Sequence, residues 1–141
     1  MRAMFIKCFV LYVIAVTSAS LATANDLVVE ITRDDTFSPN IARISSGETI
    51  NWAPKVNGHN VEFVKGPAGA NLPPKSVLST NTSMKFVETG VYLYWCTPHK
   101  DMGMLGLVVV GNDLSNLKGI LEVDMSRQSK SVLRALITSL Q

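Results

Sequence analysis

Short runs of strand-forming residues, each followed by a turn signal, fill the middle of this chain and restrict its fold more than any other feature. Apolar and β-branched residues alternate or cluster over a few positions at a time, which is typical of half-buried strands. Gly, Pro and Asn-Gly residues separate the runs. The expected strands cover residues 27–32, 41–44, 49–53, 61–64, 83–87, 91–95 and 106–110. Short strands at this spacing, with no helical period among them, predict a β-sandwich or barrel.

The end of the chain changes from a strand pattern to a helix pattern. Asp113 or Ser115 is the expected start of a first helix, and apolar residues follow at helical spacing. Ser129 or Ser131 is the expected cap of a second helix with one apolar side. Residues 112–141 are too few to bury a core of their own. We therefore expect two short amphipathic helices that cover the strands, within one domain.

The first 24 residues are typical of a secretory signal. Arg2 and Lys7 lie beside an uninterrupted apolar run at residues 9–16, and small residues follow as far as Ala24. The run is well short of the roughly 20 residues that a permanent membrane-spanning helix needs, which disfavours the alternative of an uncleaved anchor. We expect cleavage after Ala24, a mature domain of residues 25–141, and a periplasmic location.

The charge balance excludes several classes of partner. The chain has 13 Lys and Arg residues against 11 Asp and Glu residues, a formal net charge of +2. Loss of Arg2 and Lys7 with the signal leaves 11 basic against 11 acidic residues. There is no basic stripe with interleaved aromatic residues and no Gly-rich phosphate loop in the sequence. We therefore expect no nucleic-acid or nucleotide partner.

A lone cysteine and the two histidines of the chain form the pattern that bears on chemistry. Cys96 is the only cysteine left once Cys8 is removed with the signal, and such a thiol is buried and inert, pairs with another chain, or binds a metal. His99 and Met104 follow it closely, and His59 is the other histidine. Taken singly, these are ordinary core or loop residues. Together, one thiolate, two imidazoles and a thioether are the ligands of a blue-copper centre.

Other interpretations of the same residues are weaker. A zinc site accepts one Cys and two His, but Met is a poor fourth ligand for zinc. An enzyme that used Cys96 as nucleophile and His99 as base would need a third residue to orient the imidazole, and the sequence offers no obvious one. Enzymes with several copper ions need more than two histidines. A copper-delivery protein without an electron-carrier role stays as the alternative, although such proteins favour exposed Met-rich or His-rich sites.

The sequence resembles the small blue copper proteins, or cupredoxins, and within them the pseudoazurins. The similarity extends over nearly all of residues 25–141, and the two trailing helices are typical of pseudoazurins rather than of plastocyanins or amicyanins. The matching segments are Gly47-Glu48-Thr49, Trp52-Ala53-Pro54, Gly58-His59-Asn60-Val61-Glu62, Gly90-Val91-Tyr92-Leu93, Cys96-Thr97-Pro98-His99, Met102-Gly103-Met104 and Asn116-Leu117.

The resemblance implies a mainly β, Greek-key β-sandwich with strands at about 27–111 and two short C-terminal helices. It also implies one type 1 copper ion per chain, with ligands His59, Cys96, His99 and Met104. The implied function is that of a single-electron carrier and not of an enzyme. The implied partners are redox proteins that dock transiently, such as a nitrite reductase of denitrification or a cytochrome. The protein itself is expected to be a monomer that does not insert stably into a membrane.

Residues around the ligands receive roles by the same resemblance. Asn60 is expected to connect the two ligand loops as a hydrogen-bonding neighbour. The apolar docking patch is expected at Pro54, Pro98 and Met102, with Lys55 and Lys100 at its rim. The chain departs from the family in its short loop at residues 33–37, in Trp95 where a lysine is usual, and in the acidic residues Asp35 and Asp101 near the expected rim.

Overall fold

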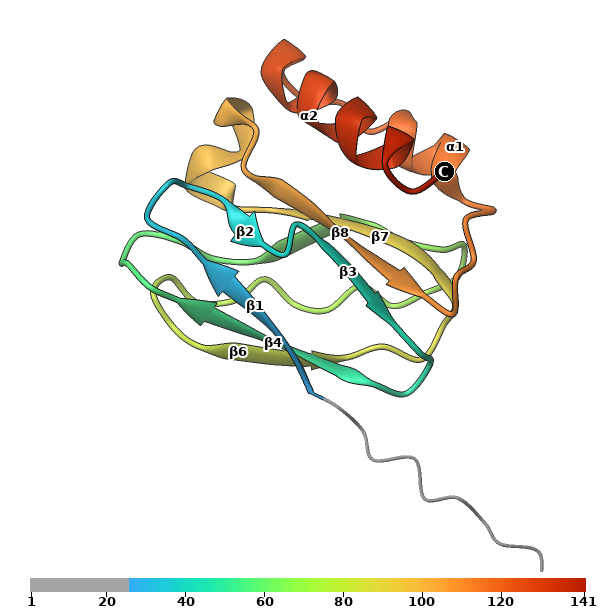
Figure 1. The fold of residues 1–141 in the computed structure, drawn as a ribbon, viewed down its shortest axis with the longest axis horizontal. Helices are drawn as coiled ribbons and strands as arrows, with labels where there is room; N and C mark the ends of the chain where they lie inside the picture. Colours follow the sequence, from blue (N-terminus) through green and yellow to red (C-terminus); the bar gives the residue numbers. More distant parts are fainter. Residues whose placement is uncertain (1–25) are drawn as a thin grey trace, which may run out of the picture.

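Two four-stranded sheets lie face to face in the computed structural model, which describes residues 26–141 (Figure 1). One sheet has the order β2-β1-β4-β6 and the other β3-β8-β7-β5. The strands are β1 Leu27–Ile31, β2 Phe37–Ser38, β3 Ile41–Ile44, β4 Thr49–Pro54, β5 Glu62–Lys65, β6 Thr82–Lys85, β7 Gly90–Trp95 and β8 Leu105–Val110. The predicted mainly β sandwich is therefore confirmed. The predicted signal segment, including Cys8, lies outside the described residues.

Alternation along the strands builds the core between the sheets. In β1, Val29 and Ile31 point inward, while their neighbours Val28 and Glu30 are exposed. Aromatic rings from both sheets meet in this core, with the Trp52 and Tyr94 rings 5.5 Å apart at their centroids in an edge-on arrangement. Such contacts add to the stabilisation from apolar burial.

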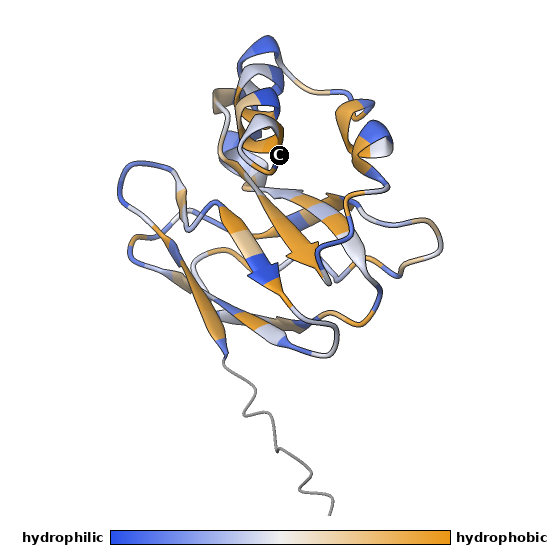
Figure 2. Cartoon of the chain, turned by 45° about the vertical axis from the view of Figure 1, so that its right-hand side comes forward, coloured by the Kyte–Doolittle hydropathy of each residue, from blue (hydrophilic) through white to orange (hydrophobic). Residues whose placement is uncertain are grey.

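The strands β7 and β8 are buried on both faces, so their sequences are almost continuously apolar. One face of these strands packs into the sandwich core, and the helices α1 (Leu117–Leu121) and α2 (Arg127–Thr138) cover the other (Figure 2). The apolar residues of this second layer are Val91, Leu93, Leu105, Leu107, Val109, Ile120, Leu133, Leu136, Ile137 and Leu140. The predicted helical tail is thus part of the domain.

The helix starts differ from those predicted. Helix α2 begins after Ser126, whose Oγ accepts a hydrogen bond from the Ser129 N–H at 3.1 Å. Ser129 and Ser131, the predicted caps, lie within the first turns, because the extended backbone that a cap requires occurs at Ser126. Helix α1 begins after Asn116, whose side chain bonds the backbone of β7 instead of capping its own helix.

Two further short elements escaped prediction. Strand β2 has two residues, Phe37 and Ser38, too few for an alternating pattern to be recognised. A 3₁₀ helix, η1, covers Thr97–Met102 in the loop that was predicted to hold three ligands. Over residues 26–141, none of the helices is both long enough and apolar enough to cross a membrane.

Candidate metal centre

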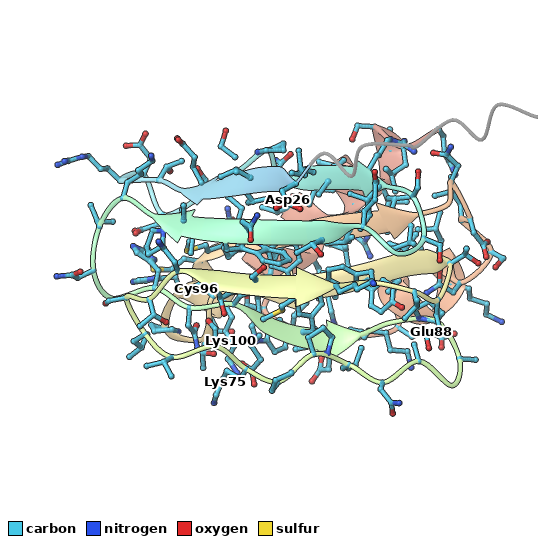
Figure 3. All side chains as sticks on the ribbon, turned by 90° about the horizontal axis from the view of Figure 1, so that it is seen from below. Asp26, Lys75, Glu88, Cys96 and Lys100 are labelled. Atoms are coloured by element: carbon cyan, nitrogen blue, oxygen red, sulfur yellow. The ribbon has the colours of Figure 1, made fainter. Side chains whose placement is uncertain are left out.

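The predicted ligands come from two segments that meet at one end of the sandwich. His59 precedes β5, Cys96 directly follows β7, His99 lies in η1, and Met104 directly precedes β8. Because β5, β7 and β8 are neighbours in one sheet, these segments are neighbours too. Figure 3 places Cys96 and Lys100 at this end and Glu88 at the opposite end.

The side chains of His59, Cys96 and His99 converge on one point. Cys96 Sγ lies 3.6 Å from His59 Nδ1 and 3.4 Å from His99 Nδ1. The two imidazole centroids are 4.7 Å apart, and one ligand atom from each of the three side chains lies within 4.8 Å of the others. Cys96 is a free and fully buried cysteine. The structure therefore brings the Cys96 thiol together with two imidazoles. His59 lies 37 residues before Cys96 in the sequence, and His99 lies 3 residues after it.

Met102 and Met104, which follow in the chain, differ in burial. The side chain of Met104 is 2% exposed, whereas that of Met102 is 62% exposed. The backbone of Met104 is bonded to both neighbouring ligand residues, since its carbonyl accepts from Cys96 N at 3.0 Å and its N–H donates to His99 O at 3.3 Å. Met104 is thus the methionine that the fold holds beside the cluster.

The loop from Cys96 to Met104 is fixed by its own backbone. Pro98 lies in the first turn of η1, and His99 N donates to Cys96 O at 3.0 Å. Gly103 ends η1 with φ of 91°, and a Cβ atom there would lie 2.9 Å from a methyl carbon of Val132. A side chain at position 103 would therefore meet both backbone strain and helix α2.

A hydrogen-bonded chain connects the loop of His59 to the loop of Cys96. Asn60 Nδ2 donates to Thr97 Oγ1 at 3.0 Å, and Thr97 N donates to Asn60 Oδ1 at 2.8 Å. Thr97 Oγ1 in turn donates to Glu62 Oε2 at 2.7 Å, and Trp95 Nε1 donates to the same oxygen at 2.8 Å. The predicted role of Asn60 is confirmed. Glu62 was missed, although it lies in the same short segment as His59, because its partners Trp95 and Thr97 come from β7 and η1.

In two groups of the cluster, His59 and Cys96, burial shifts the pKa in the direction that favours the neutral form. Burial lowers the pKa of the His59 imidazole, the nearby His99 lowers it further, and the carboxylate of Asp35 opposes both effects. Burial raises the pKa of the Cys96 thiol, against backbone hydrogen bonds of Asn60 and His99 that lower it. Desolvated imidazole and sulfur donors suit a copper or zinc ion rather than Ca²⁺ or Mg²⁺, which prefer oxygen. A metal ion bound here would release the thiol proton.

The residues predicted to form the docking patch differ in their surroundings. Pro98 and Met102 are exposed, and Pro54 is half-buried. Lys55 forms an ion pair with Glu30 at 2.9 Å, so its charge is already balanced. Lys100 Nζ lies 5.2 Å from the centroid of the Trp95 ring, at a distance that favours a cation–π contact.

Comparisons with known proteins agree with this geometry. A sequence model of copper-binding proteins of the plastocyanin/azurin family matches residues 25–111. The chain belongs to this family of copper-binding proteins. It is 33% identical to the pseudoazurin of Methylorubrum extorquens over 135 residues, which cover 91% of this chain and 90% of that protein. A plastocyanin of Synechococcus is 33% identical over 103 residues, but that match covers only 63% of this chain.

Solved structures give the same result for the fold. The crystal structure of pseudoazurin from Methylobacterium extorquens superposes with a TM-score of 0.75 and 31% identity, covering 83% of this chain and 100% of the other. This cupredoxin is therefore close to the pseudoazurins, and copper is its metal. It is a blue copper protein of electron transport.

Proposed function

We propose that the protein is an exported type 1 copper carrier of single electrons, with His59, Cys96, His99 and Met104 as the copper ligands. The observation that supports this most is the convergence of one thiol and two imidazoles, within 4.8 Å of one another, in a member of a copper-binding family. The burial of Met104 beside them supports its assignment as the weak axial ligand.

Copper supplies a one-electron couple between Cu(II) and Cu(I), and the protein supplies a site that does not rearrange between the two states. Cys96 and His59 are buried in the folded chain, so water is kept from their side of the cluster. The hydrogen bonds between Asn60 and Thr97 fix the separation of the two ligand loops. A site held in this way lowers the structural cost of each electron transfer.

His99 is the ligand proposed to face the partner. Its imidazole is half-buried, whereas that of His59 is 3% exposed. Exposed Pro98 and Met102 lie on the same short segment as His99 and offer an apolar surface for docking. Redox partners must separate quickly after transfer, which small and weak interfaces allow.

The proposed location rests on the sequence of residues 1–24, and the proposed partners rest on the resemblance to pseudoazurins. The charged, apolar and small-residue regions of residues 1–24 support cleavage after Ala24 and export to the periplasm. We propose a monomer that exchanges electrons with redox proteins, such as a nitrite reductase or a cytochrome, and that has no catalytic activity of its own.

Copper loading tests the proposal. The mature chain loaded with Cu(II) should show an intense visible thiolate-to-copper band, and Cys96→Ser should lose that band because the thiolate is its source. The conservative control is Ser131→Thr, an exposed residue outside the proposed ligand set. A blue band that persists in Cys96→Ser would contradict the ligand assignment.

Reversible cycling separates the electron carrier from the alternative, a copper-delivery protein. A carrier should pass through repeated oxidation and reduction by a chemical reductant and oxidant with its copper retained after gel filtration. Loss of the copper ion to a chelator in the Cu(I) state, within the time of one cycle, would favour delivery.

A further inference from the structure

A carboxylate lies beside His59, the more deeply buried of the two predicted imidazole ligands. Asp35 Oδ1 is 3.5 Å from His59 Nε2, on the side of the imidazole opposite Nδ1, which faces Cys96 Sγ. The imidazole is 3% exposed and the Asp35 side chain is 40% exposed. Asp35 therefore separates the buried ring from solvent at this edge.

The turn that carries Asp35 is held firmly. Thr32 N donates to Thr36 O at 2.9 Å, the hydroxyls of the same two residues lie 2.7 Å apart, and Asp34 N donates to Thr32 Oγ1 at 3.3 Å. β1 and β2 pair in antiparallel register on either side of the turn. Asp35 itself has φ of 52°, a left-handed conformation that Asp and Asn tolerate better than most residues.

The position of the carboxylate has a chemical consequence for a ligand bound through Nδ1. The remaining proton of the imidazole is then on Nε2, where it faces Asp35 Oδ1. The distance of 3.5 Å is long for a hydrogen bond, so the interaction is chiefly one of charge. A negative charge at this point stabilises the more positive oxidation state of the metal. It also makes the imidazole a stronger donor.

We infer that Asp35 is a positioning residue that favours the oxidised state of the copper site through His59. This inference rests on the proposed function, since it takes His59 as a copper ligand. Asp34 and Asp35 both line a surface cavity of about 300 Å³ together with Met102 and Met104, so the contact with His59 is what sets Asp35 apart. Asp34, its neighbour with the same formal charge, is exposed and forms no ion pair within residues 26–141.

Asp35→Asn tests the inference, with Asp34→Asn as the matched control. Asparagine has nearly the same shape and accepts the left-handed turn, so the substitution removes the charge alone. We expect Asp35→Asn to change the ratio of Cu(II) to Cu(I) affinity about three- to tenfold toward Cu(I), a rise in potential of up to about 59 mV for one electron. Asp34→Asn should change the ratio less than about twofold, because an exposed charge is screened. Asp35→Glu, which restores the charge, should bring the potential back toward that of the wild type.

The readouts distinguish the possible failures. Each variant is first examined for the visible thiolate band and for its midpoint of thermal unfolding without copper. A wild-type protein that lacks the band would overturn the proposed function itself. Blue variants with equal potentials for Asp35→Asn and the wild type, or equal shifts for Asp35→Asn and Asp34→Asn, would overturn the role of Asp35. An Asp35→Asn shift that Asp35→Glu does not reverse would also overturn it.

Discussion

Met102 and Met104 are two positions apart, yet the backbone gives them opposite surroundings. Gly103, between them, turns the chain out of η1, so Met102 remains at the surface and Met104 enters the core. The thioether of a type 1 site is a weak ligand that adjusts the potential rather than holding the metal. The consequences of changing each methionine should therefore differ in kind.

Met104→Gln should change the optical and electron spin resonance spectra of the copper-loaded protein and lower its potential, because an amide oxygen favours Cu(II) more than a thioether does. Met102→Leu should leave the spectra unchanged and alter only the rates of reaction with partner proteins. Absorption and resonance spectra of both variants provide the test. The reverse result would mean that the axial ligand is assigned two positions too far along the chain.

Asn60 makes two hydrogen bonds to Thr97, and its side chain is 5% exposed. Asn60→Ala leaves the N–H and hydroxyl of Thr97 without these partners, which should destabilise the fold by about 1–3 kcal/mol. Chemical unfolding of the copper-free protein measures this loss. The exposed Asn71→Ala is the control and should change the free energy of unfolding by less than about 0.5 kcal/mol.

Glu62 gives this network a pH dependence. Hydrogen bonds from Thr97 and Trp95, with smaller contributions from Lys75 and Lys100, outweigh burial and lower the pKa of Glu62 below its ordinary value of 4.5. A depressed folded-state pKa stabilises the fold above 4.5, and this contribution is lost as the pH falls through the lowered pKa. The free energy of unfolding is therefore measured between pH 6 and pH 3, on either side of about 4.5. Over this range it should fall less in Glu62→Gln than in the wild type. Equal losses would contradict this role.

At the scale of elements, helix α2 supports the loop that holds the ligands. Ser126 Oγ donates to Asp101 O at 2.8 Å, and the hydroxyl of the buried Ser129 donates to Lys100 O. Val132, one turn further on, packs against Gly103. The helix therefore gives the Asp101 carbonyl a partner, and it gives a second partner to the Lys100 carbonyl, which also accepts from Gly103 N at 3.3 Å. The C-terminal helix thus does more than cover the sheet.

Ser129→Ala tests this support. It should destabilise the protein by about 1–3 kcal/mol, because the hydrogen bond from the fully buried Ser129 hydroxyl to the Lys100 carbonyl is lost. It should also hasten the loss of copper to a chelator, since the loop with His99 becomes freer. Ser131→Ala, on the exposed side of the same helix, should leave both quantities nearly unchanged. Similar losses in the two variants would indicate a general effect on the helix.

At the scale of the whole molecule, charge is arranged unevenly around a nearly neutral domain. Lys100 lies at the ligand end, where Figure 3 also labels Lys75, whereas Lys55 is already paired with Glu30. Lys85 lies opposite Thr49, the first residue of β4. His59 follows the last residue of that strand, so Lys85 lies at the other end of the strand. Of the two lysines predicted at the rim, Lys100 is therefore the better candidate for attracting a negatively charged partner.

Lys100→Glu should slow the oxidation of the reduced protein by hexacyanoferrate(III), a small trianion, by about three- to tenfold at low salt. Added salt should slow the wild type toward the same rate. Lys85→Glu, which makes the same charge change at the other end, and Lys55→Glu should both have smaller effects, and Asp101→Asn should raise the rate. Stopped-flow measurements at several ionic strengths provide the test. Rates that are flat with salt and equal in all variants would mean that docking depends on apolar contact alone.

Features that depend on near neighbours in the chain could be predicted from the residues alone. Strand alternation predicted most of the sandwich, because each strand repeats its pattern every two residues. The spacing of Cys96, His99 and Met104 predicted the metal loop, because three donors in one short segment remain close in any fold. His59 was found with them because it is the other histidine.

Relations between distant segments became visible only in the folded chain. It placed Asp35 beside His59, connected Glu62 to Trp95 and Thr97, and bonded helix α2 to the loop with His99. It also paired Lys55 with Glu30, so the charge of that lysine is balanced. These contacts depend on how the strands are ordered and turned in the two sheets. The pairing of elements far apart in the chain is set by packing of the whole core, and local residue patterns do not encode it.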